Sequence, residues 1–462
     1  MSIARQHLMI LGGGPAGYVG ALRAARLGFE VTLVERKELG GTCLNWGCIP
    51  SKSILHTARI AVEARQLFPE TASQAGKSQG EWNAMRERKI HAVQNLKAGV
   101  ASLLRGAHVE VVQGEGRVVS PREIVVGQGK DRRTIRGDAL LVATGSEPLV
   151  PGLFASEDPR VVTSTEALEL KEKPTSVMVV GAGAVGVEFA RFYAAFGVSV
   201  TIVEMMDQCI PGSDSEMARA LQKSLERAGI EILLGSKVVK LESVKRGIQV
   251  QLEDGKSLKA GQVLVAIGRK LNLEGIGLDE IGVERDESGR FLKTSKQMQT
   301  SVQGVFAAGD ITGGYLLAHK ASAEALTAVS SLAGKGQPVR YDRIPACIYG
   351  EPEMASVGAT EEALKSQGVQ YGVGKFHYSH LGRAWAEGKT EGFFKVLADS
   401  ITGEIFGVHI LGESATEMIH EACVALRLEA TVEELMAVIH SHPSFSEGLW
   451  EATASTIHMG IH

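Results

Sequence analysis

The sequence has few cysteines, no long uncharged apolar run and no strong excess of one charge. Its 462 residues include five cysteines, an odd count that is unlike the disulfide framework of a small secreted domain. No apolar stretch reaches the length of a membrane span without charges or repeated glycines. The net charge of -4 argues against a broad nucleic-acid surface. These features predict a globular protein with neither a membrane nor a nucleic-acid partner.

The first residues lead at once into a strand-like apolar run, "HLMIL". Neither an apolar signal core nor an Arg- and Ser-rich transit region precedes this run. We therefore expect a cytoplasmic location, as in a bacterial cytosol, although a processed organellar protein has the same features. The length predicts about three domains, with no low-complexity linker between them.

One pattern occurs twice: an apolar strand, a glycine-rich turn, a helix, and a strand that ends in glutamate. The first copy contains "GGGPAG" and ends at Glu35, and the second contains "GAGAVG" and ends at Glu204. The two copies keep the same internal spacing throughout. Strand, glycine turn, helix and strand form the dinucleotide-binding unit, so we expect one nucleotide at each copy.

Each glycine of the motif has its own expected task. The first makes the tight turn, the second lets a pyrophosphate approach the backbone at a helix N-terminus, and the third lets the helix pack closely. In chain order these glycines are Gly12, Gly14 and Gly17, then Gly181, Gly183 and Gly186. Glu35 and Glu204 can each bind a ribose hydroxyl. Glu204 would repel a 2′-phosphate and no Arg follows it, so the second site should prefer NAD over NADP.

The rest of the chain predicts an α/β protein with two Rossmann-like domains and a C-terminal α+β domain that could form an interface. Residues 53–107 look mostly helical, and short strands follow from about residue 108. After about residue 345 strands alternate with helices and no phosphate loop occurs. The predicted domains are a first nucleotide-binding part, a second nucleotide-binding domain, a central domain, and an interface domain. Their boundaries are 1–147, 148–275, 276–345 and 346–462.

The segment "GGTCLNWGCIPSK" holds Cys43 and Cys48. A structural zinc site would need four ligands, usually in CxxC pairs, and neither the spacing nor a second pair fits. Two reduced core thiols remain an alternative, but Asn45, Trp46 and the glycines make a poor core segment. We favour a redox-active dithiol at the start of a helix, where the helix dipole and Lys52 stabilise a thiolate.

The three other cysteines, Cys209, Cys347 and Cys423, lie in apolar surroundings and are interpreted as inert core thiols. Two dinucleotide units and one dithiol together predict an electron relay. One nucleotide should be a flavin, because a nicotinamide carries hydride whereas a disulfide accepts electrons through a thiolate.

At this point the sequence resembles a known family, the flavoprotein disulfide reductases, over its whole length. The resemblance rests on the cysteine segment, on "GGGPAGY", "ATGS" and "GAGAVGVEFA", on "VFAAGD", and on "HSHPSFSE" near the C-terminus. Within that family the chain is most similar to the dihydrolipoamide dehydrogenase branch. "AHK" at 318–320 and Glu204 support this placement, and an extra C-terminal cysteine pair typical of mercuric reductases does not occur.

The resemblance implies roles for the dithiol and its neighbours. Cys43 would be the interchange thiol that meets the substrate, and Cys48 would be the charge-transfer thiolate nearer the flavin. Lys52 would lie near flavin N5 and pair with Glu188.

The resemblance also implies a catalytic base, His442, whose ring Glu447 would orient. A dithiol must lose a proton before it attacks a disulfide, imidazole titrates near neutrality, and a carboxylate fixes its tautomer. His442 would act on the disulfide of the partner subunit, which makes a homodimer necessary. The family's peptide bond at His442–Pro443 is cis.

The remaining implied contacts are to the two nucleotides. Asp310 would bind the ribityl chain of FAD. The other FAD contacts would come from Gly116, Thr144, Gly145, Ala318 and His319. Gly268 would contact NAD. The resemblance likewise implies that 1–147 is the first part of the FAD-binding domain, 148–275 the NAD-binding domain, 276–345 a central domain that completes the FAD site, and 346–462 the dimerisation domain.

Four positions depart from the family pattern: Leu271, "HLGRA" at 380–384, Cys347 and Ser444. None of them lies on the proposed electron path. The resemblance implies an enzyme that oxidises protein-bound dihydrolipoyl groups and passes hydride to NAD. Its partner would be a lipoylated acyltransferase or the carrier protein of glycine cleavage. A reductase of another disulfide and a non-enzymatic flavin sensor remain alternatives.

Overall fold

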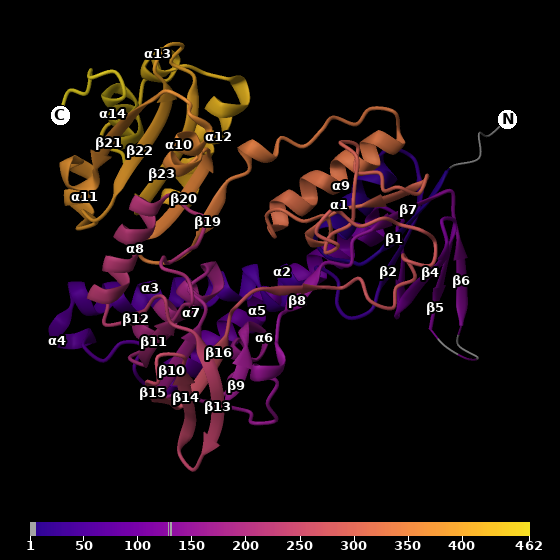
Figure 1. Ribbon diagram of the computed structural model, residues 1–462, viewed down its shortest axis with the longest axis horizontal. Coiled ribbons are helices and arrows are strands. Elements are labelled where there is room, and N and C mark those ends of the chain that lie inside the picture. Colours follow the sequence, from indigo (N-terminus) through magenta and orange to yellow (C-terminus); the bar gives the residue numbers. More distant parts are fainter. Residues whose placement is uncertain (1–5, 128, 130–131) are drawn as a thin grey trace. The chain divides into compact units, whose positions relative to one another are not determined.

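The strand before the first glycine loop is the central strand of a five-stranded parallel sheet (Figure 1). The structure is a computed structural model that describes residues 6–127, 129 and 132–462. β1 pairs with β2 on one side and with β7 on the other, in continuous register. The sheet order is β18-β7-β1-β2-β3. The strands are β1 (His7–Leu11), β2 (Glu30–Glu35), β3 (Glu110–Gln113), β7 (Ala139–Val142) and β18 (Val305–Ala307). Residues 1–5, on which part of the leader expectation rests, lie outside the described residues.

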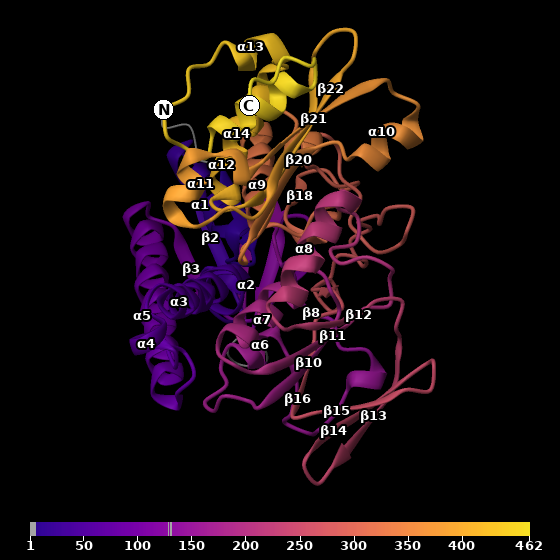
Figure 2. The same cartoon turned by 90° about the vertical axis from the view of Figure 1, so that its left-hand side faces the viewer.

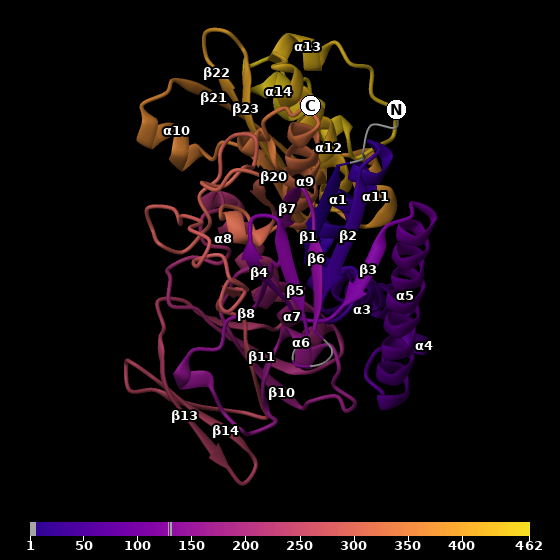
Figure 3. The same ribbon diagram turned by 90° about the vertical axis from the view of Figure 1, so that its right-hand side faces the viewer.

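Helices cover one face of this sheet and a small second sheet covers the other (Figure 3). α1 (Pro15–Arg26) and α9 (Ala318–Leu332) pack against each other and against β1 and β2. Small residues on both helices, such as Ala21 and Ala325, allow this close approach. The opposite face packs on the antiparallel strands β4 (Gly116–Ser120), β5 (Glu123–Val126) and β6 (Arg133–Arg136).

The second glycine-loop segment repeats this design. Its parallel sheet has the order β12-β11-β10-β16-β9, with the glycine loop after the central strand β10. The strands are β9 (Val161–Thr163), β10 (Ser176–Val180), β11 (Ser199–Val203), β12 (Glu231–Leu233) and β16 (Gln262–Val265). The helices are α7 (Ala184–Ala195) and α8 (Ser215–Arg227), and an antiparallel sheet of β13 (Val238–Val244), β14 (Gly247–Leu252) and β15 (Ser257–Ala260) packs on one face.

A helical segment lies between β2 and β3 in sequence. It consists of α2 (Gly41–Trp46), α3 (Cys48–Leu67), α4 (Pro69–Ala72) and α5 (Gln79–Gly106). Ser78 and Glu81 start α5 with reciprocal capping hydrogen bonds, as the sequence "SQGE" favours. Trp82 follows and is buried among aromatic rings of α7 and its C-cap, 5.3 Å from Phe192 and 5.4 Å from Phe196 between centroids.

The C-terminal region forms an antiparallel sheet with the order β19-β20-β23-β22-β21 (Figure 2). α12 (Ala415–Leu428) packs against β20 and β23, and α14 (Glu447–Ser455) packs against β21 and β22. The strands are β19 (Ala346–Ile348), β20 (Glu353–Gly358), β21 (Tyr371–His377), β22 (Phe393–Asp399) and β23 (Ile405–Gly412). This region is α+β, as predicted.

The chain divides into two compact units. The first comprises Met1–Ser53, Met85–Leu149 and Gly268–Val339, and the second comprises Ile54–Ala84, Val150–Ile267 and Arg340–His462. The predicted fold class of two dinucleotide-type sheets and an α+β region is confirmed. The four predicted domain boundaries stay a prediction. Among the described residues, every helix is too short or too polar to span a lipid bilayer.

Candidate active site and nucleotide-binding loops

The first glycine loop turns sharply at the carboxyl end of β1. Gly12 has a φ of +106°, and a Cβ at this position would lie 2.3 Å from the carbonyl oxygen of Ala143. Only glycine accepts this conformation and this close approach. At Gly14, by contrast, a Cβ would meet only the Cα of Gly41, at 3.9 Å, so the loop is open there. The predicted tight turn is present, and phosphate binding at Gly14 stays a prediction.

Glu35 holds the loop in place. One carboxylate oxygen accepts a hydrogen bond from the Gly13 N–H at 2.6 Å, and the other accepts one from the Lys37 N–H at 2.7 Å. The side chain is 8% exposed. Each carboxylate oxygen has a second lone pair, so these bonds leave capacity for a ribose hydroxyl.

A cavity of about 980 Å³ opens beside this loop. Four of the residues predicted to bind FAD line it: Gly12, Glu35, Gly116 and Thr144. Its volume is that of a small-molecule site, so these residues fit the adenosine part of a dinucleotide. Gly17 lies behind the loop, where a Cβ would clash with the Gly12 carbonyl oxygen at 1.8 Å.

The second loop has the same local geometry. Gly181 has a φ of +106°, and its Cβ would lie 2.4 Å from the Ala266 carbonyl oxygen, while Gly186 takes the place of Gly17. Glu204 accepts hydrogen bonds from the Ala182 N–H at 2.7 Å and the Met206 N–H at 2.8 Å. Nothing lies within 4 Å of a Cβ built at Gly183, so this loop also has room for a pyrophosphate.

Thr144 and a further FAD candidate, Gly145, lie in the loop after β7, and another, Asp310, lies in the turn after β18. Asn272 ties down the first loop, because its side-chain amide donates to the Thr144 carbonyl and its N–H donates to the Gly145 carbonyl, both at 2.9 Å. Asp310 follows Gly309 and accepts a hydrogen bond from the Ser146 hydroxyl.

Arg269 fixes Ser146 in turn. Its guanidinium donates to the Ser146 hydroxyl at 2.6 Å and to the Ser146 carbonyl at 2.7 Å, and it lies 3.7 Å from Asp310. Ala318 and His319 begin α9, and the His319 side chain is exposed. Gly268 lies between β16 and β17 (Arg269–Leu271), with a φ of +130°.

The two redox cysteines lie on different helices. Cys48 begins α3 as predicted, whereas Cys43 belongs to the short helix α2. The cysteines lie on separate helices because one glycine flanks each end of α2. Gly40, before the helix, has a left-handed conformation, and Gly47 ends the helix before Cys48. Asn45 braces α2 by donating from its amide to the carbonyls of Leu39 and Gly41, at 3.0 and 2.9 Å.

The thiols are in contact. A hydrogen bond to Cys48, together with burial, raises the pKa of the Cys43 thiol, and the charge of Lys52 acts in the opposite direction. These contacts disfavour a thiolate on Cys43, and the thiolate role of Cys48 stays a prediction. Thr42 connects this segment to the end of the loop after β7, because its hydroxyl donates a hydrogen bond to the Ser146 carbonyl at 3.3 Å.

Lys52 and Glu188 belong to different units. Lys52 lies on α3, 3.4 Å from the Ser51 hydroxyl. Glu188 is buried on α7, and its carboxylate accepts a hydrogen bond from the Tyr349 N–H at 3.0 Å. Their predicted ion pair stays a prediction.

His442 and Glu447 form a dyad within the second unit. His442 Nδ1 lies 2.8 Å from Glu447 Oε1, and the His442 side chain is 78% exposed. The Ser444 N–H donates to the second carboxylate oxygen at 2.7 Å. Burial acts to raise the pKa of Glu447, but the bonds from Ser444 and His442 outweigh it and hold that pKa below its usual value. The His442–Pro443 bond is cis, as expected.

Sequence reasoning missed a second histidine–carboxylate pair. His440 Nε2 lies 2.7 Å from Glu421 Oε1, and this hydrogen bond raises the pKa of His440. Glu421 is on α12, far from His440 in sequence, so no local pattern indicates the pair.

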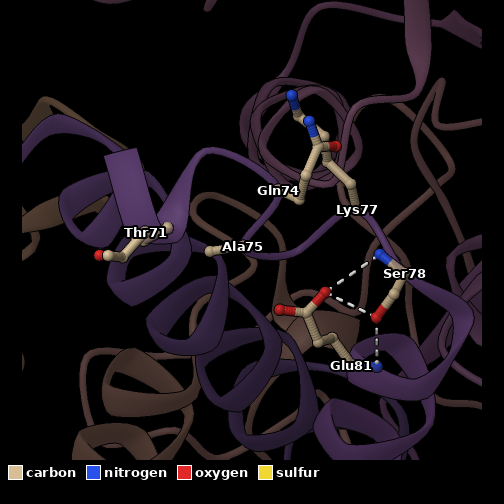
Figure 4. A pocket seen from close by; sticks show the side chains of 7 residues that line it. Thr71, Gln74, Ala75, Lys77, Ser78 and Glu81 are labelled. Atoms are coloured by element: carbon tan, nitrogen blue, oxygen red, sulfur yellow. Dashed lines mark hydrogen bonds between the residues drawn. The ribbon is translucent and has the colours of Figure 1, made fainter. Parts of the chain in front are cut away.

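A further cavity, of about 480 Å³, lies at the turn between α4 and α5 (Figure 4). Its lining includes Ser78 and Glu81, whose side chains bond to each other at 2.7 Å as part of the α5 cap. None of the predicted site residues lines this cavity. Among the described residues, no cluster of three or more His, Cys, Asp or Glu side chains could hold a metal ion.

Two nucleotide loops, the Cys43–Cys48 dithiol and the His442–Glu447 dyad define the chain as a dinucleotide-dependent thiol–disulfide oxidoreductase. The family model "Pyridine nucleotide-disulphide oxidoreductase" matches residues 6–325, and the dimerisation domain of the same family matches residues 344–453. The chain therefore belongs to the pyridine nucleotide-disulphide oxidoreductase family. It is an oxidoreductase that uses FAD and NAD, and its dimerisation domain indicates a homodimer.

Several named proteins are similar over almost the whole chain. Mitochondrial dihydrolipoyl dehydrogenase of Pisum sativum is 40% identical, over 98% of this chain and 92% of that protein. Leghemoglobin reductase of Glycine max is 39% identical, over 97% and 87%. The crystal structure of LpdA from Mycobacterium tuberculosis has a TM-score of 0.90 and 27% identity, over 97% and 99%. Relatives of nearly equal identity thus carry names that differ in substrate.

Proposed function

We propose that this chain oxidises protein-bound dihydrolipoyl groups to the disulfide and reduces NAD. The observation that carries this proposal is the set of thiol-handling groups, with His442 Nδ1 2.8 Å from Glu447 and the Cys43 thiol in hydrogen-bond contact with Cys48. The dihydrolipoyl dehydrogenase relatives, at 40% identity, support the substrate.

The base in this reaction is His442. It accepts the proton of one substrate thiol, and the ionised Glu447 stabilises the charged imidazole that results. We place this step on the disulfide of the partner subunit, as the resemblance implies. In the single chain the His442 side chain is 78% exposed, which leaves it able to face a partner subunit.

The cysteines accept the two electrons of the substrate dithiol by thiol–disulfide exchange. The substrate thiolate attacks the Cys43 sulfur, which breaks the Cys43–Cys48 bond and forms a mixed disulfide with Cys43. The second substrate thiol then displaces Cys43, which leaves an oxidised lipoyl disulfide and a reduced Cys43–Cys48 pair. Bound FAD supplies the conversion of the two thiol electrons into a hydride for NAD. Overall, one dithiol and NAD⁺ give one disulfide, NADH and a proton.

The glycine loops bind the two nucleotides in this proposal. Gly12, Gly14, Gly17 and Glu35 hold FAD with Asp310, and their counterparts Gly181, Gly183, Gly186 and Glu204 hold NAD. Both carboxylates already hold their loops by two backbone hydrogen bonds, so the sites are pre-organised.

The partner in this proposal is a lipoylated acyltransferase or the carrier protein of glycine cleavage. A lipoyl arm brings a neutral dithiol to the enzyme on a long tether, which suits an exposed base. The predicted cytoplasmic location and the four domain boundaries belong to the same proposal.

The test is NADH formation from dihydrolipoamide by the FAD-loaded wild type, against NADP, glutathione and mercuric ion. We expect turnover with dihydrolipoamide and NAD, and its loss in Cys48→Ser. Cys423→Ser is the matched control and should keep its activity. A FAD-loaded protein that does not turn over dihydrolipoamide would refute the proposal, and activity with another disulfide would then identify it as a reductase of that compound.

A further inference from the structure

Two oppositely charged side chains are buried beneath the turn that carries Asp310. Lys320 and Glu324 lie one turn apart on α9, and their exposed fractions are 1% and 0%. Lys320 Nζ lies 3.1 Å from Glu324 Oε1. Moving two charges out of water costs free energy that their attraction only partly returns, so such a pair is weak evidence for stability. The pair therefore needs another explanation.

The charges are also in the wrong order to stabilise the helix. Lys320 lies in the first turn of α9, where the helix dipole disfavours a cation, and Glu324 follows it. An isolated helix gains more from the reverse order, with glutamate before lysine. Helix stability thus does not account for the pair.

The polar contacts of the pair converge on one backbone turn. The Gly309 N–H donates to Glu324 Oε2 at 2.8 Å, and the Gly309 carbonyl accepts from Lys320 Nζ at 3.0 Å. The Thr312 hydroxyl lies 2.9 Å from Lys320 Nζ and 2.9 Å from Glu324 Oε1. Both peptide groups that flank Gly309 are therefore held by buried charges, immediately before Asp310.

Gly309 is a position where such control matters. Its φ of +92° lies in a region that glycine enters freely, so the backbone alone does not fix the direction in which Asp310 leaves the turn. Ser146 and Arg269 contact the carboxylate of Asp310, whereas the buried charges act on the backbone just before it.

We infer that Lys320 and Glu324 are positioning residues for the flavin. They hold the 309–312 turn so that the Asp310 carboxylate points at the ribityl chain of FAD, and they take no part in the reaction. This inference rests on the proposed function, because the contact between Asp310 and FAD is part of that proposal.

The test replaces both charges at once in the full-length protein, as Lys320→Met/Glu324→Met. An apolar pair of similar volume leaves no unpaired buried charge, but it does leave the Gly309 N–H without its acceptor, so the protein should fold with a moderately lowered thermal stability. The FAD dissociation constant should rise about tenfold or more, because two charge-assisted hydrogen bonds that fix the turn are lost. Flavin fluorescence during titration of the apoprotein measures this constant, together with the FAD content of the purified protein.

A second variant guards against a double variant that does not fold. Thr312→Val removes only the hydroxyl that both charges share, and FAD affinity should again fall. Lys395→Met is the matched control: Lys395 is also 1% exposed and lies 2.8 Å from the buried Asp214, but in the other unit. It should lower stability and leave FAD affinity unchanged.

The outcomes separate the two hypotheses. A wild type that binds no FAD would overturn the proposed function. A wild type that binds FAD, with unchanged FAD affinity in folded Lys320→Met/Glu324→Met and Thr312→Val, would overturn the positioning inference alone.

Discussion

Glu35 and Glu204 hold two separate glycine loops in the same way. Each carboxylate accepts one hydrogen bond from the second residue of its loop and another from the residue two positions after itself. The four bonds are 2.6 to 2.8 Å long. Charged acceptors at these distances make strong bonds, so the loops are fixed before a nucleotide binds.

Replacing the first glycine of one loop should weaken binding of that loop's nucleotide alone. In Gly12→Ala the new methyl group would lie 2.3 Å from the Ala143 carbonyl oxygen, and in Gly181→Ala it would lie 2.4 Å from that of Ala266. We expect Gly12→Ala to lose FAD. Gly181→Ala should keep FAD but show a KM for NAD that is raised roughly tenfold or more, given a strain of about 1–3 kcal/mol at each loop. FAD content and NAD kinetics measure the two effects.

Gly28→Ala is the matched control for these variants. Gly28 also has a positive φ, of +90°, but nothing lies within 4 Å of its Cβ position. It should show backbone strain alone and keep both nucleotides. Loss of FAD in Gly28→Ala would mean that strain, and not the clash in the loop, explains the result.

Replacing the proposed base should separate chemistry from cofactor binding. We expect His442→Gln to lower the rate of dihydrolipoamide oxidation by about 10²- to 10⁴-fold, the usual contribution of a general base. FAD content should not change, because His442 belongs to the second compact unit, whereas the FAD candidates belong to the first. His91→Gln, an exposed histidine on α5, is the control. A rate within a few fold of the wild type would remove His442 from the mechanism.

The buried pair of Lys395 and Asp214 should make stability depend on acid pH. Burial acts to raise the pKa of Asp214, but the hydrogen bond from Lys395 and the charges of His409 and Lys395 outweigh it and lower that pKa. A carboxyl group with a lowered folded pKa contributes stability above its unfolded pKa, and this is lost as pH falls through the folded value. The free energy of unfolding should therefore drop below about pH 4, and this part of the drop should disappear in Asp214→Asn.

His409 also makes the free energy of unfolding depend on pH. Burial lowers its pKa, so a loss of stability begins below about pH 6.5. The charge of Asp214 partly opposes this shift, so Asp214→Asn should enlarge the loss near pH 6 while it removes the Asp214 part of the drop below about pH 4. At neutral pH, Lys395→Met should cost about 3–5 kcal/mol, since it leaves Asp214 buried without its partner. Lys240→Met, at an exposed ion pair with Glu242, should cost under about 1 kcal/mol. Equal costs would contradict the assignment.

Thiol labelling should find one reactive pair. Burial raises the pKa of Cys209 and of Cys423 to about 11, so both stay protonated and unreactive at neutral pH. We expect alkylation at Cys43 and Cys48 only after reduction with NADH, as mass mapping of the labelled peptides would show. Labelling of Cys209 in the folded protein would contradict this reading.

The sequence predicts well whatever depends on short spacing. The glycine loops, Cys43 with Cys48, and His442 with Glu447 all lie within a few residues of their partners, and the structure brings each set into contact. Local turns and helix starts need no information about distant packing, so their residue pattern is enough to identify them.

Pairs made by packing could not be predicted in this way. His440 meets Glu421, and Lys395 meets Asp214, only because distant elements pack together. Lys320 and Glu324 do lie four residues apart, but such a pair normally marks a solvent-exposed helix face. Nothing in the sequence indicates that this pair is buried. The division of the cysteine segment into two helices also depends on the conformations of Gly40 and Gly47.

The two nucleotide units have the same plan beyond their loops, since each has three antiparallel strands between its third parallel strand and the strand that pairs with the other side of its central strand. They differ in the origin of the edge strand, which is β18, late in the chain, in the first sheet and β9, before the glycine loop, in the second. They also differ in one crossover: α8 alone joins β11 to β12, whereas α2 to α5, with both redox cysteines, join β2 to β3. The redox centre is thus carried by a single crossover of a repeated binding module, and the α8 crossover is the corresponding place at which a new reactive group could be engineered into the second copy.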